Sequence, residues 1–199
     1  MKGTRGFTLI ELLVVVAIIG LITATAMPTI TSYFKLSLNS TAREMAETIK
    51  EAYNSAVITG NVHRVVYDLK EHQYWVEAGP PTAVLETQES RERDSRRTKT
   101  SKEEGPPPSP FKMQKSVTRK KQNLPRGVEF EDIVTQRFKE PISEGLAYSH
   151  FFPHGISERT LVHLKDDSEH HLSLVISPVL GRTDVYERQI PREEAFNEK

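Results

Sequence analysis

Three sets of residues in this chain have types and spacing that could support chemistry. A single carboxylate, Glu11, lies in an otherwise apolar run from Phe7 to Met27. Five of the seven histidines fall in the last fifty residues, and two basic clusters, RERDSRR and KSVTRKK, lie in the middle of the chain. These sets could respectively form an ion pair in an apolar environment, bind a metal, or bind an anion.

The histidines do not predict a metal site. No His-x-x-x-His helical pair occurs, and no Asp or Glu stands at an established ligand spacing from them. We expect exposed strand and turn histidines, with no metal and no cofactor, at His150, His154, His163, His170 and His171. The chain has no cysteine, which excludes disulfides and thiol nucleophiles. It also lacks a phosphate-binding glycine loop, a G-x-S-x-G elbow and a dinucleotide fingerprint, so we expect no enzymatic activity.

The basic clusters lie in a segment whose charge differs from that of the rest. Residues 80–127 carry 12 basic and 6 acidic residues, whereas residues 128–199 carry 8 and 14, and the whole chain has a net charge of zero. The candidates for binding an anion or DNA by counterion release are Arg96, Arg97, Arg119, Lys120 and Lys121. Only Phe111 is available there for base stacking, so we favour a solvated loop and do not expect nucleic acid as a partner. Contact with the acidic 128–199 surface of a neighbouring subunit is the alternative.

The apolar run from Phe7 to Met27 is long enough to cross a membrane. As a helix it spans about 31 Å, which matches a hydrocarbon core of about 30 Å. Lys2 and Arg5 precede it, so the positive-inside rule predicts a cytoplasmic N-terminus and an exported remainder. A carboxylate near the bilayer costs about 2.5–3.5 kcal/mol, and neither a simple anchor nor a secretory signal cut at Ala24-Thr25-Ala26 gives Glu11 a purpose.

The stretch Gly6-Phe7-Thr8-Leu9-Ile10-Glu11 resembles the type III signal of type IV pilins and type II secretion pseudopilins. The resemblance implies that a prepilin peptidase cuts after Gly6 and methylates Phe7, and that the apolar run is retained. It further implies that Glu11 of one subunit neutralises the new amine of a neighbour in a helical filament, which fixes axial register because an unpaired buried charge is penalised. It also implies a helix kink at Pro28.

The rest of the chain divides by pattern. After Pro28 the apolar residues recur at spacings of three and four, which predicts one helical face: Ile30, Tyr33, Phe34, Leu38, Ala42, Met45, Ala46, Ile49, Ala52, Tyr53, Ala56 and Val57. We expect an α+β, type IV pilin-like fold in which a long N-terminal helix packs against an antiparallel β-sheet. The expected segments are a leader (1–6), a transmembrane helix (7–27), an amphipathic helix (28–59), a β-hairpin (60–79), a disordered basic insertion (80–123), a β-sheet domain (124–190) and a C-terminal tail (191–199).

The C-terminal half is similar to the GspH/FimT group of minor pseudopilins. The similarity rests on a hairpin soon after the helix, then LPRGV, FFPHG and LGRTDVY in that order. It implies a single-pass protein of the bacterial inner membrane with a periplasmic C-terminal domain, helping to export folded proteins across the outer membrane. The implied partners are other pseudopilins, the prepilin peptidase, the inner-membrane assembly platform and membrane lipid. A minor pilin of a type IV pilus, active in pilus assembly or DNA uptake, and a secreted enzyme released after Ala26 are the alternatives.

Overall fold

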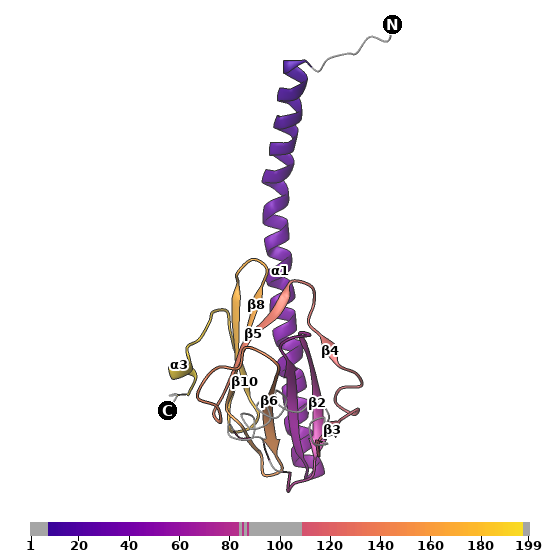
Figure 1. The fold of residues 1–199 in the computed structure, drawn as a ribbon, viewed down its shortest axis with the longest axis vertical. Helices are drawn as coiled ribbons and strands as arrows, with labels where there is room; N and C mark the ends of the chain where they lie inside the picture. The colour runs from indigo at the N-terminus through magenta and orange to yellow at the C-terminus, as the bar shows by residue number, and fades with distance from the viewer. Residues whose placement is uncertain (1–7, 84, 86, 88–108, 197–199) are drawn as a thin grey trace, which may run out of the picture.

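The structure, a computed structural model, describes residues 8–83, 85, 87 and 109–196. Within this part, the side chains of residues 24–34 are not described. The predicted leader (1–6), Phe7, Arg96 and Arg97 therefore lie outside the described residues. One long helix carries two antiparallel sheets on its C-terminal half, while its N-terminal half projects from the domain (Figure 1).

Helix α1 runs from Leu9 to Thr59. At its start, the backbone N–H of Glu11 donates to the Thr8 hydroxyl over 3.4 Å and to the Thr8 carbonyl over 3.1 Å. At its end, Gly60 adopts the left-handed conformation that favours glycine, with φ 70°, and its N–H donates to the Ala56 carbonyl. The predicted helix is confirmed. It is continuous through Pro28, and the kink at that residue stays a prediction.

The predicted apolar stripe covers one face of the C-terminal half of α1. Its fully buried members are Leu38, Ala42, Met45, Ile49, Ala52 and Ala56. Ala46 and Tyr53 are partly buried, whereas Val57 is 45 % exposed, so the stripe is narrower at its end than the sequence predicts. The side chains of residues 30, 33 and 34 lie outside the described part of the chain.

Two sheets form the β domain. Sheet A has the order β3-β2-β1-β6-β7, with β4 also paired to β2, and sheet B has the order β10-β9-β8-β5. The strands of sheet A are β1 (Val62–Asp68), β2 (Gln73–Gly79), β3 (Lys112–Met113), β4 (Gln122–Asn123), β6 (Leu146–Phe152) and β7 (Ile156–Ser157). Those of sheet B are β5 (Val128–Thr135), β8 (Thr160–Asp166), β9 (His171–Ile176) and β10 (Thr183–Tyr186). The predicted α+β class and the β1–β2 hairpin are confirmed, although the sheet is divided in two.

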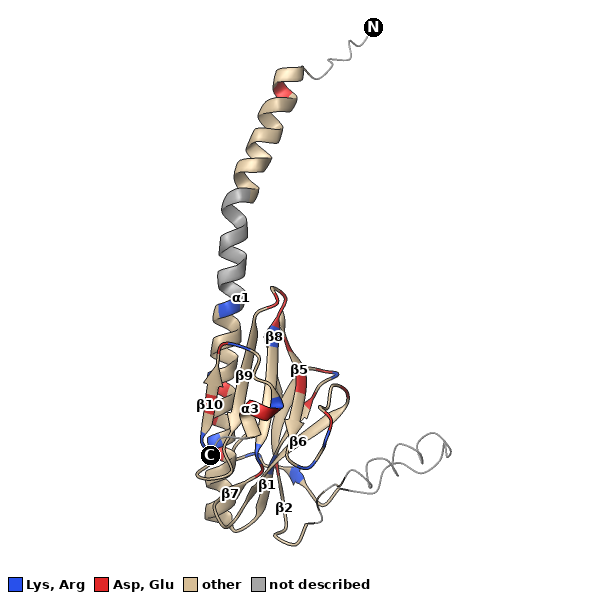
Figure 2. Ribbon diagram, turned by 90° about the vertical axis from the view of Figure 1, so that its left-hand side faces the viewer, with Lys and Arg blue, Asp and Glu red and all other residues tan. Residues whose placement is uncertain are grey.

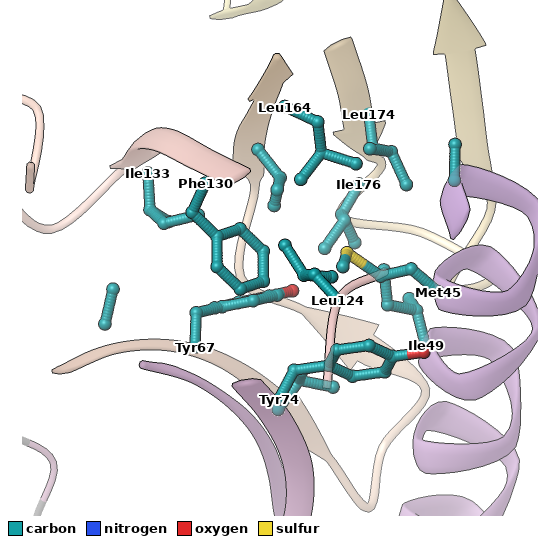
Figure 3. Close-up of a cluster of buried hydrophobic side chains, with 14 of the residues drawn as sticks. Met45, Ile49, Tyr67, Tyr74, Leu124, Phe130, Ile133, Leu164, Leu174 and Ile176 are labelled. Atoms are coloured by element: carbon teal, nitrogen blue, oxygen red, sulfur yellow. The ribbon is translucent and has the colours of Figure 1, made fainter. Parts of the chain in front are cut away.

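The core lies where α1 meets both sheets (Figure 3). Met45 and Ile49 of α1 point toward Tyr67 and Tyr74 of sheet A, and all of these side chains are buried. From sheet B, the buried side chains of Leu164, Leu174 and Ile176 complete the cluster. Burying an aliphatic side chain of this size contributes about 1.5–3 kcal/mol, so this cluster holds the domain on α1.

The predicted disordered insertion (80–123) is wrong for residues 109–123, which pack on sheet A. The backbone N–H of Gln114 donates to the Val76 carbonyl over 2.8 Å, and the Val76 N–H donates to the Thr118 hydroxyl over 2.9 Å. Phe111 is only 6 % exposed. The polar composition predicts disorder, but these few side chains meet the otherwise unpaired edge of β2, which satisfies its backbone groups.

The predicted C-terminal tail (191–199) is also more ordered than expected. Residues Arg192–Phe196 form helix α3, whose Ala195 packs with Ile190 on the outer face of sheet B, and residues 197–199 lie outside the described part. The Arg159 guanidinium donates to the Ala195 carbonyl over 3.0 Å. The sheet-B domain therefore extends past its predicted end at residue 190.

The loop between β9 and β10 depends on a glycine beside α1. Gly181 has φ 56°, and a Cβ there would come within 2.4 Å of Tyr53. We expect Gly181→Ala to lower the free energy of unfolding by about 1–2 kcal/mol for the left-handed backbone and by about 1–3 kcal/mol more for overpacking. Gly60→Ala is the matched control, because its φ is 70° with nothing within 4 Å of the new methyl group.

The measurement is urea unfolding of the detergent-solubilised chain, followed by the fluorescence of the single, buried tryptophan, Trp75. Equal losses in the two variants would show that Tyr53 does not confine this loop.

Candidate assembly interface

The N-terminal half of α1 is an apolar rod, defined as Leu9–Ile22. Its large apolar side chains are between 43 % and 83 % exposed: Leu9, Ile10, Leu12, Leu13, Val14, Val15, Val16, Ile18, Ile19, Leu21 and Ile22. Consecutive positions are exposed, so apolar groups cover the whole circumference and not one stripe. A soluble monomer rarely exposes so much contiguous apolar surface, which means that lipid or other helices must cover the rod.

The prediction that this rod crosses a membrane rests on the sequence alone. Within the described part of the chain, no helix is both long and apolar enough to cross a membrane. The predicted span Phe7–Met27 includes Phe7 and the side chains of residues 24–27, which lie outside that part.

Glu11 is the one charged side chain of the rod (Figure 2). It is exposed and lies in the first turn of α1, where the unpaired backbone N–H groups carry partial positive charge and favour a carboxylate. Among the described residues it has no ion-pair partner, so its carboxylate is free to accept from a cation of another chain. Its predicted partner, the amine of a processed Phe7, lies outside the described residues.

The predicted basic cluster is only partly brought together. Arg119, Lys120 and Lys121 are exposed between β3 and β4, and the Lys121 ammonium lies 4.0 Å from the centre of the Trp75 ring. Arg96 and Arg97 lie outside the described residues. Phe111, the predicted candidate for base stacking, is buried and therefore unavailable to a base.

Phe111 belongs instead to a clamp around Arg64, which sequence reasoning missed. The Arg64 guanidinium lies between two rings, 4.0 Å from the centre of Phe111 and 4.1 Å from that of Tyr148, and forms a 2.7 Å ion pair with Glu77. It also donates to the Ser109 hydroxyl over 3.2 Å. Arg64 and Glu77 face each other in the β1–β2 register, so the predicted hairpin already contained the signal for this pair.

The histidines are mostly paired, and three are buried: His63, His150 and His163. The expectation of exposed histidines is wrong for His150 and His163, because both are buried beside a carboxylate, Glu158 eight residues further on and Asp132 on the paired strand β5. His150 Nδ1 lies 2.7 Å from Glu158, and His163 Nδ1 lies 2.8 Å from Asp132. Across residues 8–83, 85, 87 and 109–196, no three His, Asp or Glu residues form a group that could hold a metal ion.

Comparisons with known proteins identify the N-terminal segment. Residues 1–27 match the family model described as the prokaryotic N-terminal methylation motif. The chain carries the N-terminal methylation motif of prokaryotic pilins and pseudopilins. Two fimbrial proteins of Pseudomonas aeruginosa are 42 % identical to it over 60 residues, which is 30 % of this chain and 39 % of theirs, so the chain spans well under half the length of these relatives.

A solved structure is similar over a longer range. The minor pseudopilin EpsH from the Type 2 Secretion System of Vibrio cholerae is 6 % identical, with a TM-score of 0.42, over 76 % of this chain and 97 % of that chain.

The methylation motif accounts for the position of the predicted processing residues. Gly6, Phe7 and Glu11 all lie inside the matched residues, and Glu11 stands in the first turn of the helix, which begins at Leu9. The motif implies a membrane-anchored N-terminal helix. The individual roles of these three residues stay predictions.

Two buried histidines have pKa values that shift in opposite directions. Burial lowers the pKa of His150, although the hydrogen bond and charge of Glu158 oppose it. Burial alone would also lower the pKa of His163, but Asp132 and the Ile190 carbonyl, 2.9 Å from Nε2, raise it overall. A protonated His163 donates from both nitrogens and so ties β8 to β5 and to the start of the α3 segment.

We expect His163→Gln and His150→Gln to change the pH dependence of unfolding in opposite ways. The stabilisation from His163 is complete below the ordinary value of 6.5 and is lost as the pH rises through its raised pKa. The stabilisation from a neutral His150 is present above pH 6.5 and is lost as the pH falls through the lowered pKa of this residue.

The measurement is urea unfolding between about pH 5 and about pH 8. The free energy of unfolding of the wild type minus that of the variant should fall with pH for His163→Gln and rise with pH for His150→Gln. Parallel slopes would contradict the assigned protonation states.

Proposed function

We propose that this chain is a minor pseudopilin of a type II secretion pseudopilus, of the kind to which general secretion pathway protein H belongs. The observation that carries the proposal is the exposed apolar rod of α1, which lies within the residues that match the methylation motif. A rod that the described part of the chain leaves exposed, bearing one carboxylate at its start, suits assembly among like helices.

Processing prepares the rod for assembly. The prepilin peptidase cuts after Gly6 and methylates Phe7, and Phe7–Met27 remains in the inner membrane with its N-terminus in the cytoplasm. The cut creates an amine four residues before Glu11. In the filament, Glu11 of one subunit pairs with the amine of its neighbour, which fixes how far one rod is displaced along the next.

The β domain then serves as the periplasmic part of the subunit. Its core holds the second half of α1 and leaves the apolar side chains of the rod exposed, so rods pack in the filament while domains form its surface. The chain acts by assembling with other pseudopilins through the inner-membrane platform, and not by turning over a substrate. Growth of the pseudopilus helps folded proteins to cross the outer membrane.

A deletion strain tests the secretion role. We expect exported proteins to accumulate in the periplasm while DNA uptake continues, and intact-mass analysis of the membrane-extracted chain should find an N-methylated Phe7 at its start. Normal export in the deletion strain would refute the secretion role. A mature chain starting at Met27 would refute retention of the rod.

A minor pilin of a type IV pilus is the second candidate, favoured by the match to the fimbrial proteins. This function predicts loss of pili or of transformation in the deletion strain, with export intact. If DNA is the ligand, Arg119→Ala with Lys120→Ala should weaken DNA binding by the full chain and reduce its salt dependence. The burial of Phe111 favours the secretion function over DNA binding.

Glu11→Leu separates assembly from insertion. We expect normal cleavage and membrane insertion, because the apolar run is kept, but loss of incorporation, because an unpaired buried amine costs about 3–5 kcal/mol. The measurements are the mature mass and the amount of the chain recovered with sheared filaments. Glu11→Asp is the control, since it keeps the charge and should retain partial incorporation. Equal recovery of Glu11→Leu and wild type would contradict the pairing role.

A further inference from the structure

A hollow beside α1, where the helix leaves the domain, is not used by assembly through the rod. Its volume is about 330 Å³, and three segments line it: Lys35, Leu38 and Asn39 of α1, residues 169–172 at the β8–β9 turn, and residues 187–189 after β10. The β8–β9 turn lies at the end of the domain from which α1 projects (Figure 1). A hollow of this volume is at the small end of ligand-binding sites, so it suits a small polar group.

The lining of the hollow is apolar where it is buried and charged where it is exposed. Leu38 and Leu172 are only 2 % and 1 % exposed. The exposed lining carries both signs of charge: Lys35, Arg188, Glu169 and Glu187. Among the described residues, the side-chain amides of Asn39 and Gln189 have no hydrogen-bond partner, and each offers both a donor and an acceptor. Such a lining matches a small ligand that itself carries a positive and a negative charge.

The charges of the hollow can be exchanged for those of a ligand. The Lys35 ammonium lies 3.0 Å from the Glu187 carboxylate, and the two side chains are 53 % and 61 % exposed. Arg188 is paired with Glu194, also at the surface. Exposed ion pairs contribute little to stability, so a ligand that offers both charges can replace the Lys35–Glu187 pair at little cost.

The backbone around the hollow is fixed by hydrogen bonds. The Ser173 hydroxyl donates to the Arg188 carbonyl over 2.7 Å and accepts from the Ile190 N–H over 3.0 Å, which holds the segment after β10. Asp166 accepts from the His170 N–H over 3.0 Å, which holds the β8–β9 turn. A ligand therefore does not have to order these two segments of the lining when it binds.

The position of Lys35 in the sequence places the hollow at a membrane surface. Lys35 is the first charged residue after Glu11, because residues 12–34 contain no Asp, Glu, Lys or Arg. As a helix, these residues span about 35 Å, which is the thickness of a hydrocarbon core and part of the head-group layers. With Glu11 near one surface of the bilayer, Lys35 and the hollow beside it lie at the level of the lipid phosphates on the other surface.

We propose that this hollow binds the head group of a phospholipid that carries a phosphate and a primary ammonium, of the phosphoethanolamine type, in the inserted subunit before assembly. Lys35 donates to the phosphate oxygens, and Glu187 accepts from the ammonium. Head groups that carry only a negative charge are disfavoured, because Glu169 and Glu187 repel them. The bound lipid holds the domain in one orientation on the membrane. This inference rests on the membrane anchoring of the proposed function and adds a ligand to it.

Native mass spectrometry of the detergent-solubilised full chain tests the choice of head group. The probes are three lipids with identical acyl chains and phosphoethanolamine, phosphoglycerol or phosphocholine head groups, since the apolar rod binds the acyl chains of all three alike. We expect the phosphoethanolamine lipid to bind at least about tenfold more tightly than the other two. Phosphoglycerol has no ammonium, and phosphocholine has no N–H to donate to Glu187.

Lys35→Gln/Glu187→Gln should abolish this preference, because it removes both charges and keeps the size of the side chains. Lys50→Gln/Glu51→Gln is the matched control, since it removes two opposite charges from exposed positions of α1 outside the hollow. Glu187→Gln alone should lower the affinity for the phosphoethanolamine lipid to that for the phosphoglycerol lipid. Urea unfolding followed by Trp75 fluorescence should be unchanged in all three variants.

The NMR signals of the histidine rings separate a lipid head group from free phosphate, because His170 and His171 line the hollow. At fixed pH, glycerophosphoethanolamine should shift both signals in a saturable way. Inorganic phosphate should require at least about a tenfold higher concentration for the same shift, because it offers no ammonium to the carboxylates.

Three outcomes would overturn the inference: equal affinity for the three lipids, an equal loss of preference in the Lys50→Gln/Glu51→Gln control, or equal shifts from inorganic phosphate and glycerophosphoethanolamine. The proposed function fails separately. Its failure would appear as normal export in the deletion strain, whatever head group the purified chain prefers.

Discussion

The structure depends on how unevenly the surface of α1 is covered. Over its second half, residues such as Met45 and Ile49 are fully buried beneath two sheets, whereas the described part of the chain leaves the large apolar side chains of Leu9–Ile22 exposed. One continuous helix therefore lies in two environments: its second half is in the protein core, and its first half is on the surface of the isolated chain. The buried half makes the domain stable, and the bare half makes the isolated chain incomplete, because its apolar surface is favourable only against lipid or other helices.

Continuity of the helix links the two halves mechanically. Small residues, Ala42, Ala52 and Ala56, let the strands approach the α1 backbone closely, and Tyr53 confines the β9–β10 loop on the same helix. The domain is thus fixed on α1 and cannot slide along it. A displacement between two rods then becomes the same displacement between their domains, so the proposed pairing of Glu11 would also set how neighbouring domains meet.

Helices and strands with a repeating pattern could be predicted from the sequence, whereas contacts made by individual side chains between distant segments could not. Spacings of three and four gave the second half of α1, a continuous apolar run gave its first half, and alternation gave the β1–β2 hairpin, because each pattern repeats over many residues. Residues 109–123 were missed because their composition is polar: Phe111 and Thr118 are buried, but backbone pairing with β2 also holds the segment on the sheet. The burial of His163 was missed for a related reason, since its partner Asp132 lies on β5, which only the fold pairs with β8.

The Arg64 clamp shows how a polar insertion can be tolerated. A buried guanidinium is costly unless its charge and donors are satisfied, and here Glu77, Ser109 and two rings satisfy them together. The clamp also joins the two ends of the insertion, because Phe111 packs so closely on Gly79 that a Cβ there would lie 2.7 Å from the ring. The clamp therefore closes the insertion where it meets sheet A, whatever the length of chain between Gly79 and Ser109. The backbone that carries the cations after the clamp is, in contrast, fixed on the β2 edge by its hydrogen bonds to Val76 and its pairing with β2.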